Sequence, residues 1–233
     1  MAIELVTLDC AETLVPYDFD HGRFACACLR EAGIEVDEQV AGEHYQRLVD
    51  TRWAEYWDLH AHRDDDLLDQ FWRDLVADWL DAQGVASDAL DRVLEAASKR
   101  LFGPGPVEFW LYDDVLPALD ALDRAGVRLA VVSNWDYTLP RVLKGLEIHD
   151  RFERVFVSMT EQMEKPDPRF FELVLDEMGV LPDEALHVGD NPVDDVLGAK
   201  AAGMKALLID RRASPQPGQI RTLLDVPDML WRV

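Results

Sequence analysis

Basic residues are scarce in this chain, and lysine is especially rare. The 233 residues include 23 Lys plus Arg against 46 Asp plus Glu, which gives a formal net charge of −23. Only 5 residues are lysine, whereas 30 are aspartate. Nucleic acid is disfavoured as a partner because binding it requires a positive surface. The composition is typical of salt-adapted proteins, in which salt screens self-repulsion, and equally of an acidic protein from a GC-rich genome.

Long apolar runs and cysteines are also in short supply. No stretch approaches the roughly 18 to 20 apolar residues of a membrane span, and the first ten residues do not resemble a signal peptide. We therefore expect a cytoplasmic protein with no membrane partner. The three cysteines argue against a disulfide framework. Cys26 and Cys28 have no further ligands nearby in sequence for a zinc site, and Cys10 is predicted to pack in the core.

Apolar residues are plentiful, and they fall into short runs separated by helical patterns. The 48% apolar content is enough for one sizeable core, or a core plus a smaller module. Strands are predicted at 3–8, 128–132, 154–157, 185–188 and 206–209, and helices at 115–125, 139–145, 168–179 and 193–203. Glycines 126, 145, 179 and 203 are predicted to stop these helices. The alternation predicts an α/β fold, with a Rossmann-like parallel sheet and helices on both faces.

The first two predicted strands are too far apart for one crossover connection. The sequence between them is almost purely helical in pattern, and the glycine- and proline-rich stretch at 103–106 is a strong helix breaker. We therefore predict a discontinuous α/β core, residues 1–14 and 105–233, interrupted by an all-helical insertion at 15–104.

Polar side chains follow four of the predicted strands. They are Asp9 after the first, Ser133 and Asn134 at the second, Lys165 after the third, and Asp190, Asp194 and Asp195 after the fourth. Ligands bind at the carboxyl ends of parallel strands, so we expect these groups to converge on one site.

Each of these residue types suits one part of phosphoryl transfer. A carboxylate such as Asp9 can attack phosphorus and form an aspartyl-phosphate, which divides hydrolysis into two easier steps. Clustered acids repel one another unless a cation lies between them, and Mg²⁺ prefers such oxygen ligands. Ser133 can bind the phosphoryl oxygens that are not transferred. Lys165 supplies a positive charge that keeps Asp9 ionised and stabilises the oxyanion.

Together these four motifs, in this order, resemble the haloacid dehalogenase-like (HAD) hydrolases with a helical, C1-type cap inserted after the first motif. The resemblance covers essentially the whole chain. It implies that Asp9 is the nucleophile, that Ser133 and Lys165 are catalytic, and that Asp9, the backbone carbonyl of Ala11 and Asp190 bind Mg²⁺. Asp195 is implied to support the metal, with Asp194 as the adjacent candidate.

The expected activity is that of a Mg²⁺-dependent phosphatase acting on a small phosphorylated metabolite. Asn134 and Trp135 directly follow Ser133 and are predicted to bind substrate. The sequence departs from the pattern at Ala11, because phosphatases of the family place there an Asp that protonates the leaving oxygen and activates water. Losing a general acid–base group typically lowers the rate by about 10² to 10⁴. Glu12 or a cap histidine, His60 or His62, is a candidate substitute.

Three other interpretations compete with the phosphatase. In one, which Ala11 favours, the chain retains the scaffold as a weak or inactive catalyst with a binding or regulatory role. A 2-haloacid dehalogenase is a minor alternative, disfavoured by Asp190 and by Ala11, since those relatives place an aromatic residue at this position. Phosphonoacetaldehyde hydrolases resemble the chain in having Ala there, but they need a cap lysine, and no lysine lies between Val15 and Ser98.

Overall fold

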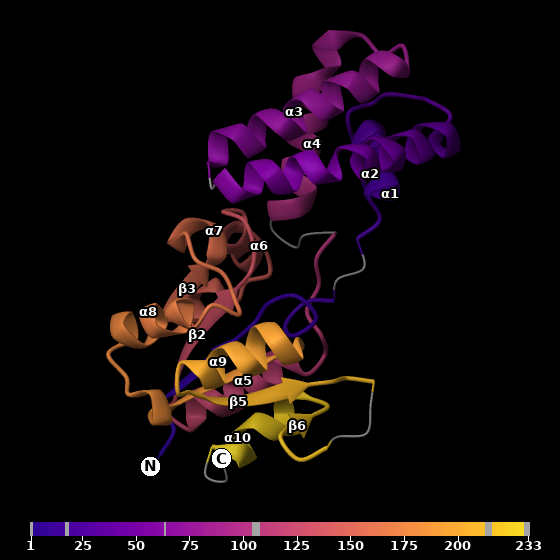
Figure 1. Cartoon of the computed structure of the whole chain (residues 1–233). Coiled ribbons are helices and arrows are strands. Elements are labelled where there is room, and N and C mark those ends of the chain that lie inside the picture. The colour runs from indigo at the N-terminus through magenta and orange to yellow at the C-terminus, as the bar shows by residue number, and fades with distance from the viewer. Residues whose placement is uncertain (1, 17–18, 63, 104–107, 213–215, 231–233) are drawn as a thin grey trace. The chain divides into compact units, whose positions relative to one another are not determined.

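The chain folds into two compact units. The computed structural model describes residues 2–16, 19–62, 64–103, 108–212 and 216–230. The core unit comprises Met1–Tyr17 and Phe109–Val233, and the helical unit comprises Asp18–Glu108 (Figure 1). The predicted boundary between residues 104 and 105 lies outside the described residues, and both predicted boundaries stay predictions.

A six-stranded parallel sheet forms the centre of the core unit. Its strands are β1 (Leu5–Leu8), β2 (Arg128–Ser133), β3 (Arg154–Val157), β4 (Ala185–Gly189), β5 (Lys205–Ile209) and β6 (Gln219–Ile220). The strand order is β3-β2-β1-β4-β5-β6, so β1 lies between β2 and β4. Every residue of β1 and β4 is buried, as expected for strands covered on both faces. The predicted α/β class is confirmed, and β6 is an additional strand.

The connections of the core unit are mostly helical. They are α5 (Val115–Arg124), α6 (Leu139–Gly145), η2 (His149–Arg151), α7 (Ser158–Glu161), α8 (Pro168–Met178), η3 (Pro182–Glu184), η4 (Pro192–Leu197), α9 (Gly198–Ala201), η5 (Leu223–Asp225) and α10 (Val226–Met229). Phe170 and Phe171 of α8 and Ala199 of α9 pack into one core cluster with Leu5 of β1. Helix α5 contacts α10 and η5. These contacts pack the helices against the sheet and against one another.

One detail of the helix prediction was wrong. The helix expected at 193–203 is instead a π-helical segment, η4, followed by the short helix α9. The helix predicted at 139–145 is confirmed as α6, and it ends at Gly145 as predicted. Gly179 does end α8 in the left-handed region, with φ 63°, where a side chain would be strained.

The helical unit consists of four helices and one short turn in the described residues. They are α1 (His21–Glu31), α2 (Glu38–His62), α3 (Asp65–Ala82), η1 (Ser87–Ala89) and α4 (Leu90–Phe102). Helix α1 packs on α2 and α4, and α3 packs on the same two helices. Trp79 is fully buried, and its indole N–H donates to the carbonyl oxygen of Ala41 at 2.9 Å. The helical insertion therefore has a core of its own.

An aromatic stripe on α2 contributes to that core. The rings of Trp53 and Tyr56 stack with centroids 5.0 Å apart, and Tyr56 is buried. Trp57 contacts both rings, yet its side chain is 53% exposed. Among the described helices of the protein, none combines the length and apolar character needed to cross a membrane.

Candidate active site

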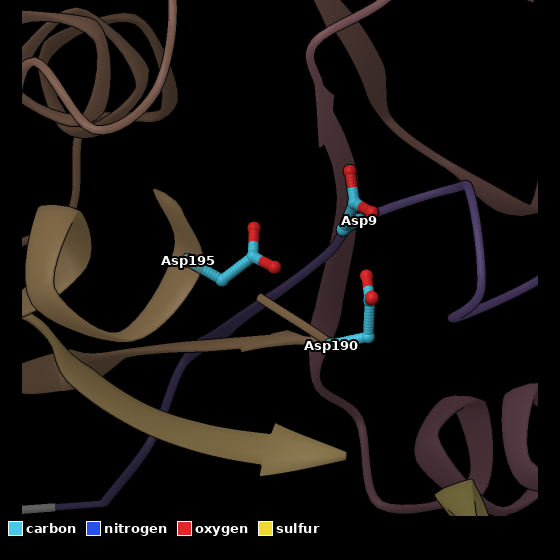
Figure 2. Close-up of side chains that lie close together, drawn as sticks. All are labelled: Asp9, Asp190 and Asp195. Carbon is cyan, nitrogen blue, oxygen red and sulfur yellow. The ribbon is translucent and has the colours of Figure 1, made fainter. Parts of the chain in front are cut away.

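Asp9 lies directly after the central strand β1 and is only 5% exposed. Its backbone N–H donates to the carbonyl oxygen of Val188 in β4 at 3.0 Å, which ties it to the neighbouring strand. Asp190 follows β4, so the two carboxylates emerge side by side at the same edge of the sheet. Figure 2 shows Asp9, Asp190 and Asp195 turned toward one shared space. The predicted convergence of these acids is thus observed.

The three carboxylates are close enough to share a cation. One oxygen from each of Asp9, Asp190 and Asp195 lies within 4.8 Å of the others. Burial, together with the nearby charges of Asp9 and Asp195, raises the pKa of Asp190 from 3.8 to about 7. The single ammonium of Lys165 does not balance three carboxylates. A hard divalent cation such as Mg²⁺ therefore fits this set of oxygen donors.

Lys165 joins two of the acids. Its Nζ donates to Asp9 Oδ1 at 2.7 Å and to Asp195 Oδ1 at 2.5 Å, and the side chain is almost completely buried. Burial alone would lower the pKa of Lys165, but the two carboxylates more than offset this and raise it. The lysine is therefore held as a cation directly beside the candidate nucleophile.

Asn134 holds the backbone of Lys165. The amide Oδ1 of Asn134 accepts the Lys165 backbone N–H at 2.8 Å, and its Nδ2 donates to the Lys165 carbonyl oxygen at 2.9 Å. Both ends of the amide thus contact protein, although Asn134 was predicted to bind substrate. Ser133, which ends β2, is buried. The indole N–H of Trp135 donates to Thr138 Oγ1 at 3.2 Å, and its ring packs near Phe109.

Asp195 is held by several donors of the protein itself. Its Oδ1 accepts from Lys165 and, at 3.1 Å, from Nε2 of His187, while Oδ2 accepts the backbone N–H of Asn191 at 2.8 Å. Burial alone would raise the pKa of Asp195, but the hydrogen bond from His187 and the charge of Lys165 hold it well below its usual range. Because its oxygens already accept these bonds, Asp195 is better suited to support a metal than to bind it directly.

Glycine is required at the end of β4. A Cβ atom built on Gly189 would lie 2.1 Å from Cγ of Asp195, far closer than atoms can approach. Asp195 belongs to the π-helical segment η4, a type of helix that often occurs at functional sites. Asp194, its neighbour in η4, accepts instead from Asn191 Nδ2 at 2.9 Å. The Gly-Asp pair at 189–190 therefore both supplies an acid and leaves room for a second one.

The segment after Asp9 forms a tight turn. The backbone N–H groups of Leu14 and Val15 both donate to the carbonyl oxygen of Cys10, and Glu12 has φ 54°. The Glu12 carboxylate accepts a hydrogen bond from the hydroxyl of Tyr112 at 3.0 Å. Ala11, half-buried in this turn, offers only a methyl group.

The roles suggested for the cap histidines stay predictions. His62 is exposed at the end of α2, and the side chain of His60 lies outside the described residues. Cys10, Cys26 and Cys28 are all buried free thiols, so Cys10 packs in the core as predicted. Sequence reasoning missed His187, because a single histidine inside an apolar strand carries no signal of its contact with Asp195.

Comparison with known proteins defines the family. The model for haloacid dehalogenase-like hydrolases matches residues 3–203, and the chain therefore belongs to the HAD-like hydrolase family. The glyceraldehyde 3-phosphate phosphatase of Methanopyrus kandleri is 30% identical, over 97% of this chain and 91% of its own length. The haloacid dehalogenase-like hydrolase domain-containing protein 3 of Bos taurus is 27% identical, over 93% of this chain and 84% of its own.

Solved structures show the same fold. The 2-haloacid dehalogenase from Pseudomonas syringae pv. Tomato DC3000 superposes with a TM-score of 0.63 and 26% identity, covering 99% of each chain. Relatives with this architecture thus include both phosphatases and dehalogenases.

Proposed function

We propose that this HAD-family hydrolase is a magnesium-dependent phosphatase that acts on a small phosphorylated metabolite through an aspartyl-phosphate on Asp9. The observation that carries the proposal is the pairing of Asp9, buried at the end of the central strand, with the ammonium of Lys165 at 2.7 Å. The similarity to the glyceraldehyde 3-phosphate phosphatase of Methanopyrus kandleri supports it. The three buried free cysteines agree with a reducing, cytoplasmic location, which is part of the proposal.

In the first step, a carboxylate oxygen of Asp9 attacks phosphorus and the bond to the leaving oxygen breaks. Because Lys165 occupies Oδ1 of Asp9, we assign the attack to Oδ2. Lys165 keeps Asp9 ionised and faces the oxygens on which negative charge accumulates. The buried Ser133 hydroxyl is assigned to the oxygens that are not transferred. When bound between Asp9, Asp190 and the Ala11 carbonyl, Mg²⁺ would offset the repulsion between carboxylate and phosphate.

In the second step, water attacks phosphorus and releases phosphate from Asp9. The leaving oxygen must take up a proton in the first step, and water must lose one in the second. The methyl group of Ala11 can do neither. The proposal therefore predicts faster turnover of substrates whose leaving group needs no proton, such as aryl phosphates, than of alkyl phosphates.

The two predicted substrate-binding residues take different parts in this proposal. Asn134 acts on the substrate indirectly, because its amide fixes the backbone of Lys165 through two hydrogen bonds. The half-buried ring of Trp135 is assigned to the wall of the pocket.

Dehalogenation is the second candidate, favoured by the similarity to the 2-haloacid dehalogenase structure. In that reaction Asp9 would displace halide from carbon, and water would then attack the carboxyl carbon of the resulting ester. The two candidates are therefore distinguished by where oxygen from labelled water appears after one turnover. It enters the released phosphate in the phosphatase, and the Asp9 carboxylate in the dehalogenase.

The test is a hydrolysis screen with an aryl phosphate, alkyl phosphates and a 2-haloacid, with Mg²⁺ or a chelator, at low and high salt. Wild type is expected to hydrolyse the aryl phosphate only with Mg²⁺, and Asp9→Asn to be inactive. Ala11→Asp is expected to increase alkyl phosphate turnover by about 10² or more. It should speed aryl phosphate turnover as well, because the loss of a proton from water in the second step is common to both substrates. Phosphatase activity that survives Asp9→Asn would rule out the mechanism. An inert wild type with an active Ala11→Asp would identify a lapsed phosphatase.

A further inference from the structure

A buried histidine that the proposed reaction does not use lies beneath the active site. His187 is in the middle of β4 and is completely buried. Its ring packs edge-on against Phe171, with centroids 5.0 Å apart. Burying a polar ring in such surroundings is unfavourable unless its nitrogens form hydrogen bonds. Both ring nitrogens of His187 do so, one toward the active site and one away from it.

The strand register provides the partner on the far side. Thr7 of β1 and His187 of β4 are paired across the two parallel strands. Oγ1 of Thr7 lies 2.8 Å from Nδ1 of His187, and both side chains are fully buried. Thr7 therefore prevents the ring from rotating and occupies the nitrogen that faces away from the active site.

The partner on the active-site side determines which nitrogen carries a proton. Nε2 of His187 lies 3.1 Å from Oδ1 of Asp195. Asp195 also accepts from the ammonium of Lys165 and from the backbone N–H of Asn191, so its carboxylate acts purely as an acceptor. Nε2 must therefore be the donor in this contact. A hydrogen on Nε2 satisfies Asp195, whichever way the proton between Thr7 and Nδ1 is placed.

These contacts form one continuous chain from Thr7 to the candidate nucleophile. Oδ1 of Asp195 receives hydrogen bonds from His187 and Lys165 at once, and Lys165 in turn donates to Asp9. If the His187 bond were lost, the Asp195 carboxylate could rotate about its side chain. Lys165 would then no longer be held between the two acids.

We propose that His187, fixed by Thr7, is a positioning residue that orients Asp195 and thereby holds Lys165 against Asp9. The inference rests on the proposed function only in taking Asp9 as the reacting group. The hydrogen-bond chain is a property of the folded protein whether or not it hydrolyses phosphate. Partners of this kind, which act through the groups around them, typically contribute about 10- to 100-fold to activity.

The test compares two amides at position 187. Gln places its N–H near the position of Nε2, so His187→Gln preserves the bond to Asp195. Asn reaches only as far as Nδ1, so His187→Asn loses that bond. We expect His187→Asn to lower kcat for the aryl phosphate about 10- to 100-fold with little change in KM, and His187→Gln to restore most of the loss. A purely structural role would change melting temperature and folded yield, but would not separate kcat from KM.

A second readout needs neither magnesium nor activity. The chain has 5 lysines, so in ¹⁵N-lysine-labelled, metal-free protein the buried ammonium of Lys165 can be assigned with a Lys165→Met sample. An ammonium held between two carboxylates exchanges its protons slowly, and its signal is expected in wild type and His187→Gln but not in His187→Asn. If no phosphate ester is hydrolysed, the proposed function fails, and this signal still decides the positioning role.

Thr7 supplies an independent pair of variants in case His187→Asn does not fold. Thr7→Ser keeps the hydroxyl and is expected to behave as wild type, whereas Thr7→Val removes it and is expected to weaken the Lys165 signal and kcat together. The proposal is overturned if His187→Asn, or Thr7→Val in its place, keeps both the Lys165 signal and kcat of wild type. It is also overturned if a folded His187→Gln is as impaired as His187→Asn.

Discussion

Replacing Asp190 by an amide, in the variant Asp190→Asn, should stabilise the metal-free protein, and more so as pH rises. Asp190 is half-buried beside Asp9 and Asp195, and these surroundings raise its pKa from 3.8 to about 7. A carboxyl group whose pKa is raised by folding contributes stability while it is protonated. That contribution is complete below about pH 4 and is lost as pH rises through about 7. The amide of the variant cannot ionise. The free energy of unfolding of Asp190→Asn therefore does not decrease in this way as pH rises.

The size of the effect follows from the pKa. A change from 3.8 to about 7 corresponds to about 4 kcal/mol, since one pKa unit is worth about 1.4 kcal/mol. Because the side chain is only half-buried, solvent screens part of this interaction, and we expect about 1 to 2 kcal/mol. The free energy of unfolding of Asp190→Asn, minus that of wild type, should therefore increase by this amount between about pH 3.5 and pH 8.

The assay is urea unfolding of both proteins with a chelator at several pH values, followed by circular dichroism. Comparing the two at each pH cancels the effect of the other acidic groups. Adding Mg²⁺ at pH 8 should stabilise wild type and leave Asp190→Asn nearly unchanged, since the variant lacks a ligand. A stability difference that is constant from about pH 3.5 to pH 8 would contradict the proposed repulsion between Asp190 and the other two carboxylates.

Three further substitutions test other parts of the structure. Gly189→Ala should displace Asp195, lower the free energy of unfolding by about 1 to 3 kcal/mol and reduce phosphatase kcat, as measured by urea unfolding and steady-state kinetics. Arg211→Met should lower the free energy of unfolding by about 3 kcal/mol, because the largely buried guanidinium donates to Asp114 at 2.8 Å, and a core unit of unchanged stability would contradict this. Trp79→Phe should lower the melting temperature of the helical unit, with a loss of about 1 to 3 kcal/mol from the unpaired carbonyl oxygen.

Local sequence patterns were enough to locate the sheet and the acids at its edge. The apolar runs before Asp9 and Asp190 are long enough to read as buried strands, and parallel pairing then brings the residues after them together. The strand β6 was missed because its two residues, Gln219 and Ile220, form no apolar run. The π-helical turn of η4 was missed because its sequence pattern is the same as that of an ordinary helix.

The supporting contacts of the site could not be predicted because they depend on register and on long-range packing. The Thr7–His187 pair joins residues far apart in the chain, and a shift of one residue in either strand would turn its side chain to the opposite face. The two hydrogen bonds between Asn134 and the backbone of Lys165 likewise arise only once the third motif is folded against the second. The residue types in the motifs therefore indicated phosphoryl transfer, but the hydrogen bonds that hold these side chains in place could be seen only in the folded structure.

Acid-quenched turnover of a ³²P-labelled phosphate donor tests whether Asp9 is the phosphorylated nucleophile. With Mg²⁺, wild type should carry label on the peptide that contains Asp9 during turnover, and Asp9→Asn should carry none. Ala11→Asp is the matched variant, because it should release the label faster without changing where it forms. Steady hydrolysis of the donor by wild type with no label on that peptide, or label that persists in Asp9→Asn, would contradict the account.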